Sequence, residues 1–347
     1  MLFATNRTPK RSVRTTINRR IEFDLQNTAA AQHMYFCERR SEGDYTEIGS
    51  KAFFERLRDL PGRTQVLLYI HGFNNTPEGV IFPRARRLQE LLDQQAEQDD
   101  ADAAPGPARV HVVPLIWPSD DDHIAAILDD YWDDQRAADA SGLAFARMLG
   151  KFDRWRTESA RSARKQARET GRPASDFICT RRINVLAHSM GNRVLRNALV
   201  TWTENDARGQ MPQLFRNVFM VAADVINHTL EAGEEGQYIP SSGRNLVVYF
   251  ANDDLAMPAS KVANLKNRTV SRRLGMTGPE DLDRVPKNVY EVDCDNFNNT
   301  CDPPKGHSYF LDCPGGAVSP VLGHMYQCIR NGRVPAEDDH SQRLRRP

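Results

Sequence analysis

The chain is predicted to fold as an α/β protein in which helices flank a mostly parallel, twisted sheet. Three observations indicate this class. Short, continuous apolar runs suit strands that are covered on both faces. Segments of helical character separate these runs, which is typical of βαβ units. Finally, the 347 residues are 40% hydrophobic, which is enough to build a substantial core.

The predicted strands and helices alternate along the chain. The first strand is short and β-prone, and the later ones are runs rich in Val, Leu, Ile and Tyr: 2–5, 65–70, 109–117, 182–187, 217–222, 245–250 and 288–292. Helices are expected at 51–58, 77–95, 120–151, onward to about 169, 190–202 and 318–329. Pro77 suits a first helical position, where its missing N–H costs nothing. The prediction is one domain over 1–335 and a polar tail at 336–347.

Composition excludes several classes of protein. Lysine plus arginine equals aspartate plus glutamate, at 46 each, so no global field attracts nucleic acid or anionic lipid. Apolar runs such as Val66–Ile70 are far shorter than the ~20 residues that span a bilayer. The first residues contain no apolar stretch of the kind found in secretory signals. We therefore expect a cytoplasmic protein with no membrane span and no nucleic-acid partner.

The sequence indicates no specific function for two polar segments. Residues 93–108 are acidic and of low complexity, which predicts a mobile loop. Basic residues then recur at helical spacing within 154–172, at Arg161, Arg164, Lys165, Arg168 and Arg172. Such a stripe is usually a solvated helix face, and we favour that over a site for an acidic ligand.

The cysteines and the acidic residues do not form a recognisable metal motif. Cys37 and Cys179 are isolated, and four more crowd into the last part of the chain at Cys294, Cys301, Cys313 and Cys328. Their spacing lacks the close pairs of a zinc site, so free thiols are expected, with disulfides only in an oxidising compartment. The oxygen-rich stretch 293–302 lacks the glycine and glutamate of an EF-hand and is interpreted as an acidic loop. No cofactor is predicted.

The most specific motif is Ala187–Gly191, which reads AHSMG between a predicted strand and a predicted helix. A small-x-Ser-x-Gly sequence in that setting is a nucleophile elbow, with Ser189 exposed on a tight turn. Small residues on either side let the strand and the helix approach each other. The N-terminus of the helix directs free N–H groups toward developing negative charge.

A second motif, His71-Gly72-Phe73, lies at the carboxyl end of an earlier strand, where α/β sheets bind ligands. The amides of Phe73 and Met190 are predicted to form an oxyanion hole. His71 by itself is equally compatible with a local hydrogen-bonding role.

A serine nucleophile needs a base and an orienting acid, which follow it in the order acid and then histidine. Asp254 is favoured because it precedes an apolar residue and a proline in a turn after a strand. Asp253 and Asp224 remain alternative acids. His307, in a loop before the closing helix, is the favoured base, since His324 falls inside that helix and His340 in the tail. His188 is interpreted as structural.

Taken together, these residues resemble the α/β-hydrolase superfamily, and within it a mainly bacterial, poorly characterised family of serine esterases and lipases. The resemblance is carried, in order along the chain, by Phe3–Arg7, Ile70–Asn75, Trp117–Ser119, Ala187–Arg193, Ala222–Val225, Tyr249–Met257, Arg273–Gly275 and Gly306–Tyr309. It implies an eight-stranded type of core, with Ser189, Asp254 and His307 as the triad.

We therefore expect a serine hydrolase that cleaves a small-molecule or lipid-like carboxylic ester through an acyl-enzyme. Segments 120–172 and 226–243 are candidate caps over the site. Two alternatives stay open: a catalytically silent binding or scaffold protein that keeps the fold, and an acyltransferase.

Overall fold

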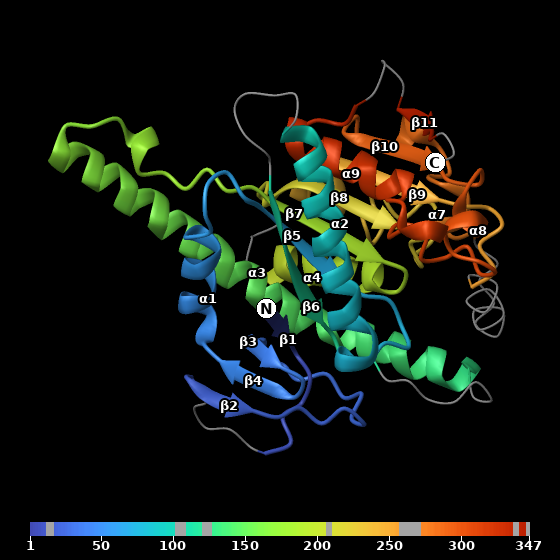
Figure 1. Ribbon diagram of the computed structural model, residues 1–347, viewed down its shortest axis with the longest axis horizontal. Helices are drawn as coiled ribbons and strands as arrows, with labels where there is room; N and C mark the ends of the chain where they lie inside the picture. Colours follow the sequence, from blue (N-terminus) through green and yellow to red (C-terminus); the bar gives the residue numbers. More distant parts are fainter. Residues whose placement is uncertain are drawn as a thin grey trace.

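The computed structural model describes residues 1–11, 17–100, 109–119, 127–205, 210–256, 272–335 and 340–344. They form one sheet in the order β11-β10-β9-β8-β7-β5-β6-β1-β3-β4-β2 (Figure 1). The strands are β1 Leu2–Thr5, β2 Arg19–Ile21, β3 Tyr35–Ser41, β4 Asp44–Glu47, β5 Gln65–Ile70, β6 Val110–Ile116, β7 Ile183–His188, β8 Phe215–Val221, β9 Gly243–Phe250, β10 Val289–Asp293 and β11 Ser341–Arg343. Strands β11 through β1 in this order are parallel, and β3, β4 and β2 extend the sheet antiparallel. The predicted fold class is confirmed.

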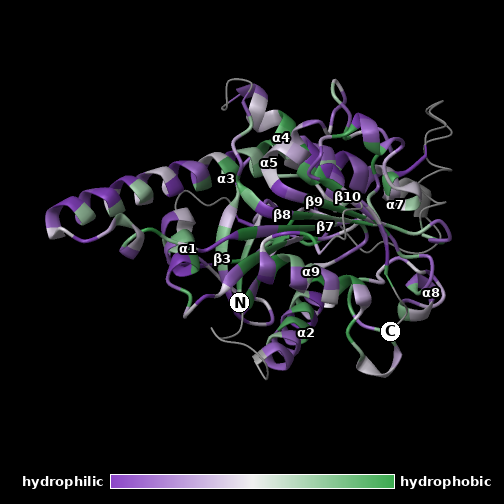
Figure 2. Cartoon of the chain, turned by 90° about the horizontal axis from the view of Figure 1, so that it is seen from above, coloured by the Kyte–Doolittle hydropathy of each residue, from purple (hydrophilic) through white to green (hydrophobic). Residues whose placement is uncertain are grey.

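Helices cover both faces of the sheet. The longer ones are α1 Gly49–Arg58, α2 Phe82–Asp100, α3 Ile127–Thr170, α4 Gly191–Asn205 and α9 Pro320–Asn331. Short helices are α5 Tyr238–Ser242, α7 Leu274–Thr277 and α8 Asn298–Cys301, and a π-helical turn at Pro77–Ile81 leads into α2. Figure 2 shows α3 and α4 on one side of the strands and α2 and α9 on the other. Every described helix is too short or too polar to cross a bilayer.

Strand β5 shows how the sheet separates two hydrophobic cores. Val66, Leu68 and Ile70 belong to the core beneath α1, α3 and α4. The alternating residues Leu67 and Tyr69 belong to the core beneath α2 and α9. This period of two places apolar side chains on both faces, which is why buried parallel strands read as continuous apolar runs.

The structure corrects several predicted boundaries. The helices expected at 120–151 and onward to 169 form one continuous helix, α3 Ile127–Thr170, and residues 120–126 lie outside the described residues. Residues 93–100 of the expected loop belong to α2, and 101–108 lie outside the described residues. Within the expected polar tail, β11 pairs with β10.

Strands β2, β3 and β4 were not predicted. Sequences such as YFCERRS in β3 and DYTE in β4 mix charged and apolar residues. They lie toward the edge of the sheet, where no second apolar face is required. Their sequences therefore lack the apolar runs that identify the central strands.

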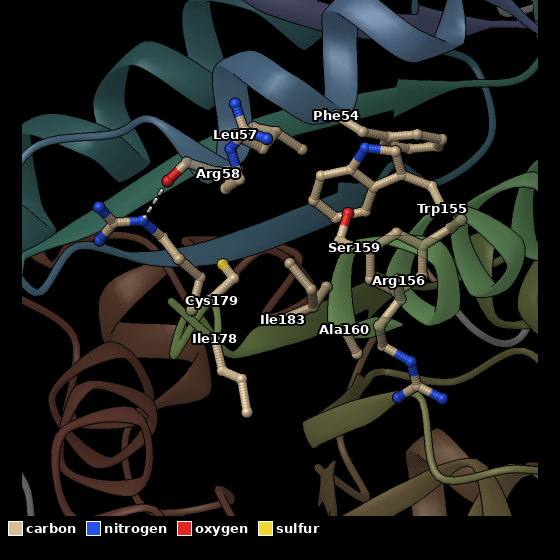
Figure 3. A pocket seen from close by; sticks show the side chains of 12 residues that line it. Phe54, Leu57, Arg58, Trp155, Arg156, Ser159, Ala160, Ile178, Cys179 and Ile183 are labelled. Carbon is tan, nitrogen blue, oxygen red and sulfur yellow. Dashed lines mark hydrogen bonds between the residues drawn. The ribbon is translucent and has the colours of Figure 1, made fainter. Parts of the chain in front are cut away.

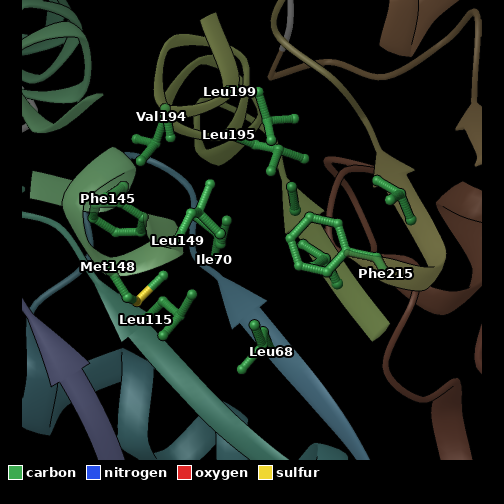
Figure 4. Packing of buried hydrophobic residues seen from close by; sticks show 14 of the residues in the cluster. Leu68, Ile70, Leu115, Phe145, Met148, Leu149, Val194, Leu195, Leu199 and Phe215 are labelled. Atoms are coloured by element: carbon green, nitrogen blue, oxygen red, sulfur yellow. The ribbon is translucent and has the colours of Figure 1, made fainter. Parts of the chain in front are cut away.

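Leu199 provides a test of the packing between α3 and α4. Its side chain is fully buried in the core shown in Figure 4. Leu199→Ala should lower the free energy of unfolding by about 2–5 kcal/mol, because it removes buried apolar contacts and leaves a cavity. Ile17→Ala, at a largely exposed side chain, should change it by less than about 0.5 kcal/mol. Urea titration of both variants measures the difference, and equal effects would contradict the assigned core.

Candidate active site

Ser189 lies on a tight turn between β7 and α4. Its φ is +53°, a left-handed conformation that costs a non-glycine residue about 1–3 kcal/mol. Its N–H donates to the carbonyl of Val221 (2.9 Å), and its own carbonyl accepts from the amides of Asn192 (3.1 Å) and Asp224 (3.2 Å). The strained turn is thus held by backbone hydrogen bonds to the neighbouring strand and to the start of α4.

The turn that follows β5 packs directly against this elbow. A β-carbon on Gly191 would lie 2.5 Å from the carbonyl oxygen of His71. A β-carbon on Gly72 would lie 3.0 Å from Cβ of Ser189. The first distance excludes a side chain at position 191, and the second is tighter than most Cβ contacts, so the two glycines allow the two backbones to meet.

Side chains also fix the turn after β5. Asn75 Nδ2 donates to the carbonyls of Gly72 (2.9 Å) and Phe73 (2.8 Å). The His71 ring stacks on Trp117, and its Nδ1 donates to the Gly72 carbonyl (2.7 Å). Burial lowers the pKa of His71 to about 3, so the ring is neutral. His71 therefore has the local hydrogen-bonding role that was one of the two interpretations of this residue.

The amides of Phe73 and Met190, which were predicted to form an oxyanion hole, come from these two packed turns. Among the described residues, neither amide donates a hydrogen bond within the protein.

His307 and Asp254 are brought together from segments more than 50 residues apart. His307 Nδ1 donates to Asp254 Oδ2 at 2.6 Å, and the Asp254 side chain is completely buried. The other carboxylate oxygen, Oδ1, accepts from the amide of Ala256 (2.9 Å). These bonds fix the carboxylate and leave the Nε2 edge of the His307 imidazole turned away from it.

The alternative acids have other partners. Asp253 accepts hydrogen bonds from the side-chain amides of Asn298 and Asn299, each at 2.5 Å. Asp224, next to the elbow, accepts from the Tyr131 hydroxyl and forms an ion pair with Arg273 (3.3 Å). Asp254 is thus the one of the three candidate acids that the described hydrogen bonds join to His307.

The loop that carries His307 is tied down at several points. Asp302 Oδ2 accepts from the amides of His307 (2.8 Å) and Ser308 (2.7 Å). A disulfide between Cys301 and Cys313 closes the loop from both sides. The expectation of free thiols is therefore wrong for these two cysteines, because their spacing did not reveal that the chain returns on itself here.

His188, the residue before Ser189, lies between the elbow and the His307 loop. Its ring is 4.8 Å from the rings of His307 and Phe310, and its Nε2 donates to the His307 carbonyl (3.2 Å). Burial lowers the pKa of His188 well below its ordinary value, so it stays neutral. The predicted structural role thus includes a direct contact with the His307 loop that the sequence did not indicate.

The remaining downstream histidines lie elsewhere. His324 is buried in α9, where its Nδ1 is hydrogen bonded to the Tyr249 hydroxyl (2.7 Å) and burial lowers its pKa to about 4. His340, expected in a free tail, donates to the Val289 carbonyl (2.8 Å) beside β11. Neither is joined to any of the three candidate acids by a described bond.

Support residues such as Asn75, Asp302 and Tyr131 were not identified from the sequence. Asn75 had a usable signal, since asparagine in a turn after a strand commonly bonds nearby backbone groups. Asp302 and Tyr131 act across long sequence separations, for which a single sequence contains no signal.

The described residues contain no group of three His, Cys, Asp or Glu side chains arranged to hold a metal ion. In the acidic stretch 293–302, Asp293 pairs with Arg343 (2.7 Å) and Asp295 accepts from Asn252. These carboxylates are used in local hydrogen bonds and ion pairs.

Residues 50–315, more than half of the chain, match the family described as "Alpha/beta hydrolase of unknown function (DUF900)". Neither a curated protein nor a solved structure matches the chain. The matched residues include the elbow at Ser189, the turn after β5 and the loop that carries His307. On the strength of this match and of the parallel sheet with its elbow, the chain belongs to this family of α/β hydrolases.

Proposed function

We propose that this α/β hydrolase is a serine hydrolase that cleaves carboxylic esters through an acyl-enzyme. The observation that carries the proposal is the hydrogen bond between His307 and Asp254. The imidazole of His307 also packs against His188, the neighbour of Ser189. A strained serine, a histidine and a buried carboxylate are the three groups that acyl transfer to a serine requires.

In the proposed reaction, His307 removes the proton from Ser189 Oγ as that oxygen attacks the ester carbonyl. Asp254 holds the imidazole and stabilises its positive charge. The amides of Phe73 and Met190 donate to the oxyanion of the tetrahedral intermediate. His307 then protonates the departing alcohol, and a water molecule activated by the same histidine releases the acid and restores Ser189.

The surroundings of the elbow favour an ester with an apolar part. Phe73 packs edge-on against Tyr131 of α3, with ring centroids 5.9 Å apart. Leu255, next to Asp254, is 61% exposed. We propose that these side chains contact the acyl or alcohol group, and that the beginning of α3 forms one wall of the site.

The first test is covalent labelling of Ser189. A fluorophosphonate probe should label the wild-type protein, and p-nitrophenyl esters should be hydrolysed. Ser189→Ala should abolish labelling and lower the rate by at least about 10⁴-fold, because the covalent route is lost. A folded wild-type protein that neither labels nor hydrolyses any ester would favour the catalytically silent alternative.

The adjacent aspartates supply a matched pair of variants. Asp254→Asn should lower kcat by about 10⁴-fold, because an amide cannot stabilise the imidazolium or enforce the same tautomer. Asp253→Asn removes the same charge one residue away, from a carboxylate bonded to Asn298 and Asn299 rather than to His307. It should retain kcat within about tenfold. Steady-state kinetics on both variants decide the acid, and the reverse ranking would reject Asp254.

The disulfide provides a test of the His307 loop. Cys313→Ser should lower the free energy of unfolding by about 2–4 kcal/mol, because the unfolded chain loses a cross-link. It should also lower kcat, because the loop that orients His307 loosens. Cys179→Ser, at an exposed free cysteine, is the matched control and should change neither quantity. If dithiothreitol changes neither the stability nor the rate of the wild-type protein, this role of the disulfide is rejected.

A further inference from the structure

A groove lies near the amino ends of the strands, at the end of the sheet opposite the elbow. It is formed by α1, the middle of α3 and the segment that leads into β7 (Figure 3). Its cavity volume is about 120 Å³, and the groove is open to solvent. Ile183, in the groove wall, begins β7, whereas Ser189 follows its end, so about 20 Å of strand separates the two sites. We call this feature the arginine-rimmed groove.

The interior of the arginine-rimmed groove is apolar. Phe54 of α1 packs against Trp155 of α3, with ring centroids 5.6 Å apart, and Leu57 and Ala160 also line the groove (Figure 3). Ile178, on the returning segment, is 39% exposed and is one of the few large apolar side chains of the described chain that reach this exposure. Apolar surface of this kind, left open to water, is typical of a binding site.

Three arginines, Arg58, Arg156 and Arg181, are among the residues that line the groove. The hydrogen bonds of Arg181 go to the backbone carbonyls of Arg58, Leu60, Gly62 and Thr64, which position the group without neutralising it. Arg58 forms a bidentate pair with the exposed Asp59. Arg156 pairs with the half-buried Asp153 and donates to the carbonyl of Gln213 (3.0 Å).

Beyond the rim, the positive charge continues along α3. Its C-terminal half projects from the body of the molecule (Figures 1 and 2). Residues 154–182 contain nine basic and three acidic residues in a chain whose formal net charge is zero. Arg161, Arg164 and Arg168 have no carboxylate partner among the described residues. This segment therefore attracts anions toward the groove.

We propose that the arginine-rimmed groove binds a single-chain anionic amphiphile, an alkyl carboxylate, separately from the catalytic site. The alkyl chain occupies the apolar interior, and the carboxylate meets the guanidinium groups of Arg58 and Arg156 at the rim. The apolar interior distinguishes this ligand from inorganic anions and from nucleic acid, whose charge would be satisfied by the basic stripe alone. The proposal does not depend on the activity proposed for Ser189.

Cys179 supplies a direct readout because it lines the groove and is exposed, whereas the other described free cysteines, Cys37, Cys294 and Cys328, are buried. Alkylation of the native protein by a maleimide therefore reports on the groove. Decanoate, kept below its critical micelle concentration, should slow this reaction about tenfold at ten times its Kd, since occupancy sets the protection. Calorimetric titration of decanoate measures the same Kd without the thiol.

Variants separate the groove from general charge attraction. Ala160→Trp, which fills the groove, should abolish decanoate binding in calorimetry while retaining the Tm and the ester hydrolysis of the wild-type protein. The double variant Arg58→Gln/Arg156→Gln should weaken decanoate binding about tenfold, because charge-assisted hydrogen bonds are lost. Arg161→Gln/Arg164→Gln removes the same charge from the stripe outside the groove and should change Kd less than threefold.

Four results would overturn the proposal. The first is an absence of decanoate binding to the wild-type protein. The second is equal weakening by the two double variants, and the third is equal protection by decanol, which would show that the anionic group is not recognised. The fourth is protection of Cys179 by phosphatidylglycerol vesicles or by duplex DNA but not by decanoate, which would assign the surface to a membrane or to nucleic acid. Labelling of Ser189 is scored separately, so failure here leaves the proposed activity intact.

Discussion

The close approach of two backbone turns determines the geometry of the candidate site. The carbonyl of His71 occupies the space in which a β-carbon on residue 191 would lie, and Ser189 lies against Gly72. Because the amides of Phe73 and Met190 belong to these same turns, the distance between them is set by this backbone contact. Side-chain flexibility cannot alter it. A preorganised pair of donors is what stabilises an oxyanion without reorganisation during the reaction.

Burial divides the three histidines around the elbow into different chemical roles. His71 and His188 are buried, and desolvation lowers the pKa of each, so both remain neutral at physiological pH. Their rings can then serve as fixed hydrogen-bonding groups that add no positive charge beside His307. His307 is partly exposed and is hydrogen bonded to the buried Asp254. The proposed base is thus distinguished from its neighbours by its surroundings.

Features that depend on local sequence could be predicted, whereas features that depend on contacts between distant residues could not. The elbow and the central strands depend on local sequence, and both were found, because buried parallel strands need continuous apolar runs. Asp254 was favoured over Asp253 from the turn sequence, but Asp253 stayed open as an alternative, since adjacent residues in one turn differ mainly in the direction of their side chains. The Cys301–Cys313 disulfide and the Asp302 contacts depend on how the chain returns on itself. The edge strands β2, β3 and β4 were missed because charged residues interrupt their apolar pattern.

The carboxyl and amino ends of the parallel strands differ because the strands all run in the same direction. At the carboxyl ends of the strands, turns such as those after β5, β7 and β9 bring Phe73, Ser189 and Asp254 into one region, as is general for open α/β sheets. At the amino ends, chain segments enter the sheet from helices, and the space between α1 and α3 is left open as the arginine-rimmed groove. Because β7 is buried and joins both regions, a ligand in the groove would contact the start of the strand whose end carries Ser189. Helix α3 also joins the two regions, since Trp155 lines the groove and Tyr131 packs against Phe73. We expect binding and hydrolysis to be separable by mutation, because Ala160 and Cys179 line the groove and not the elbow.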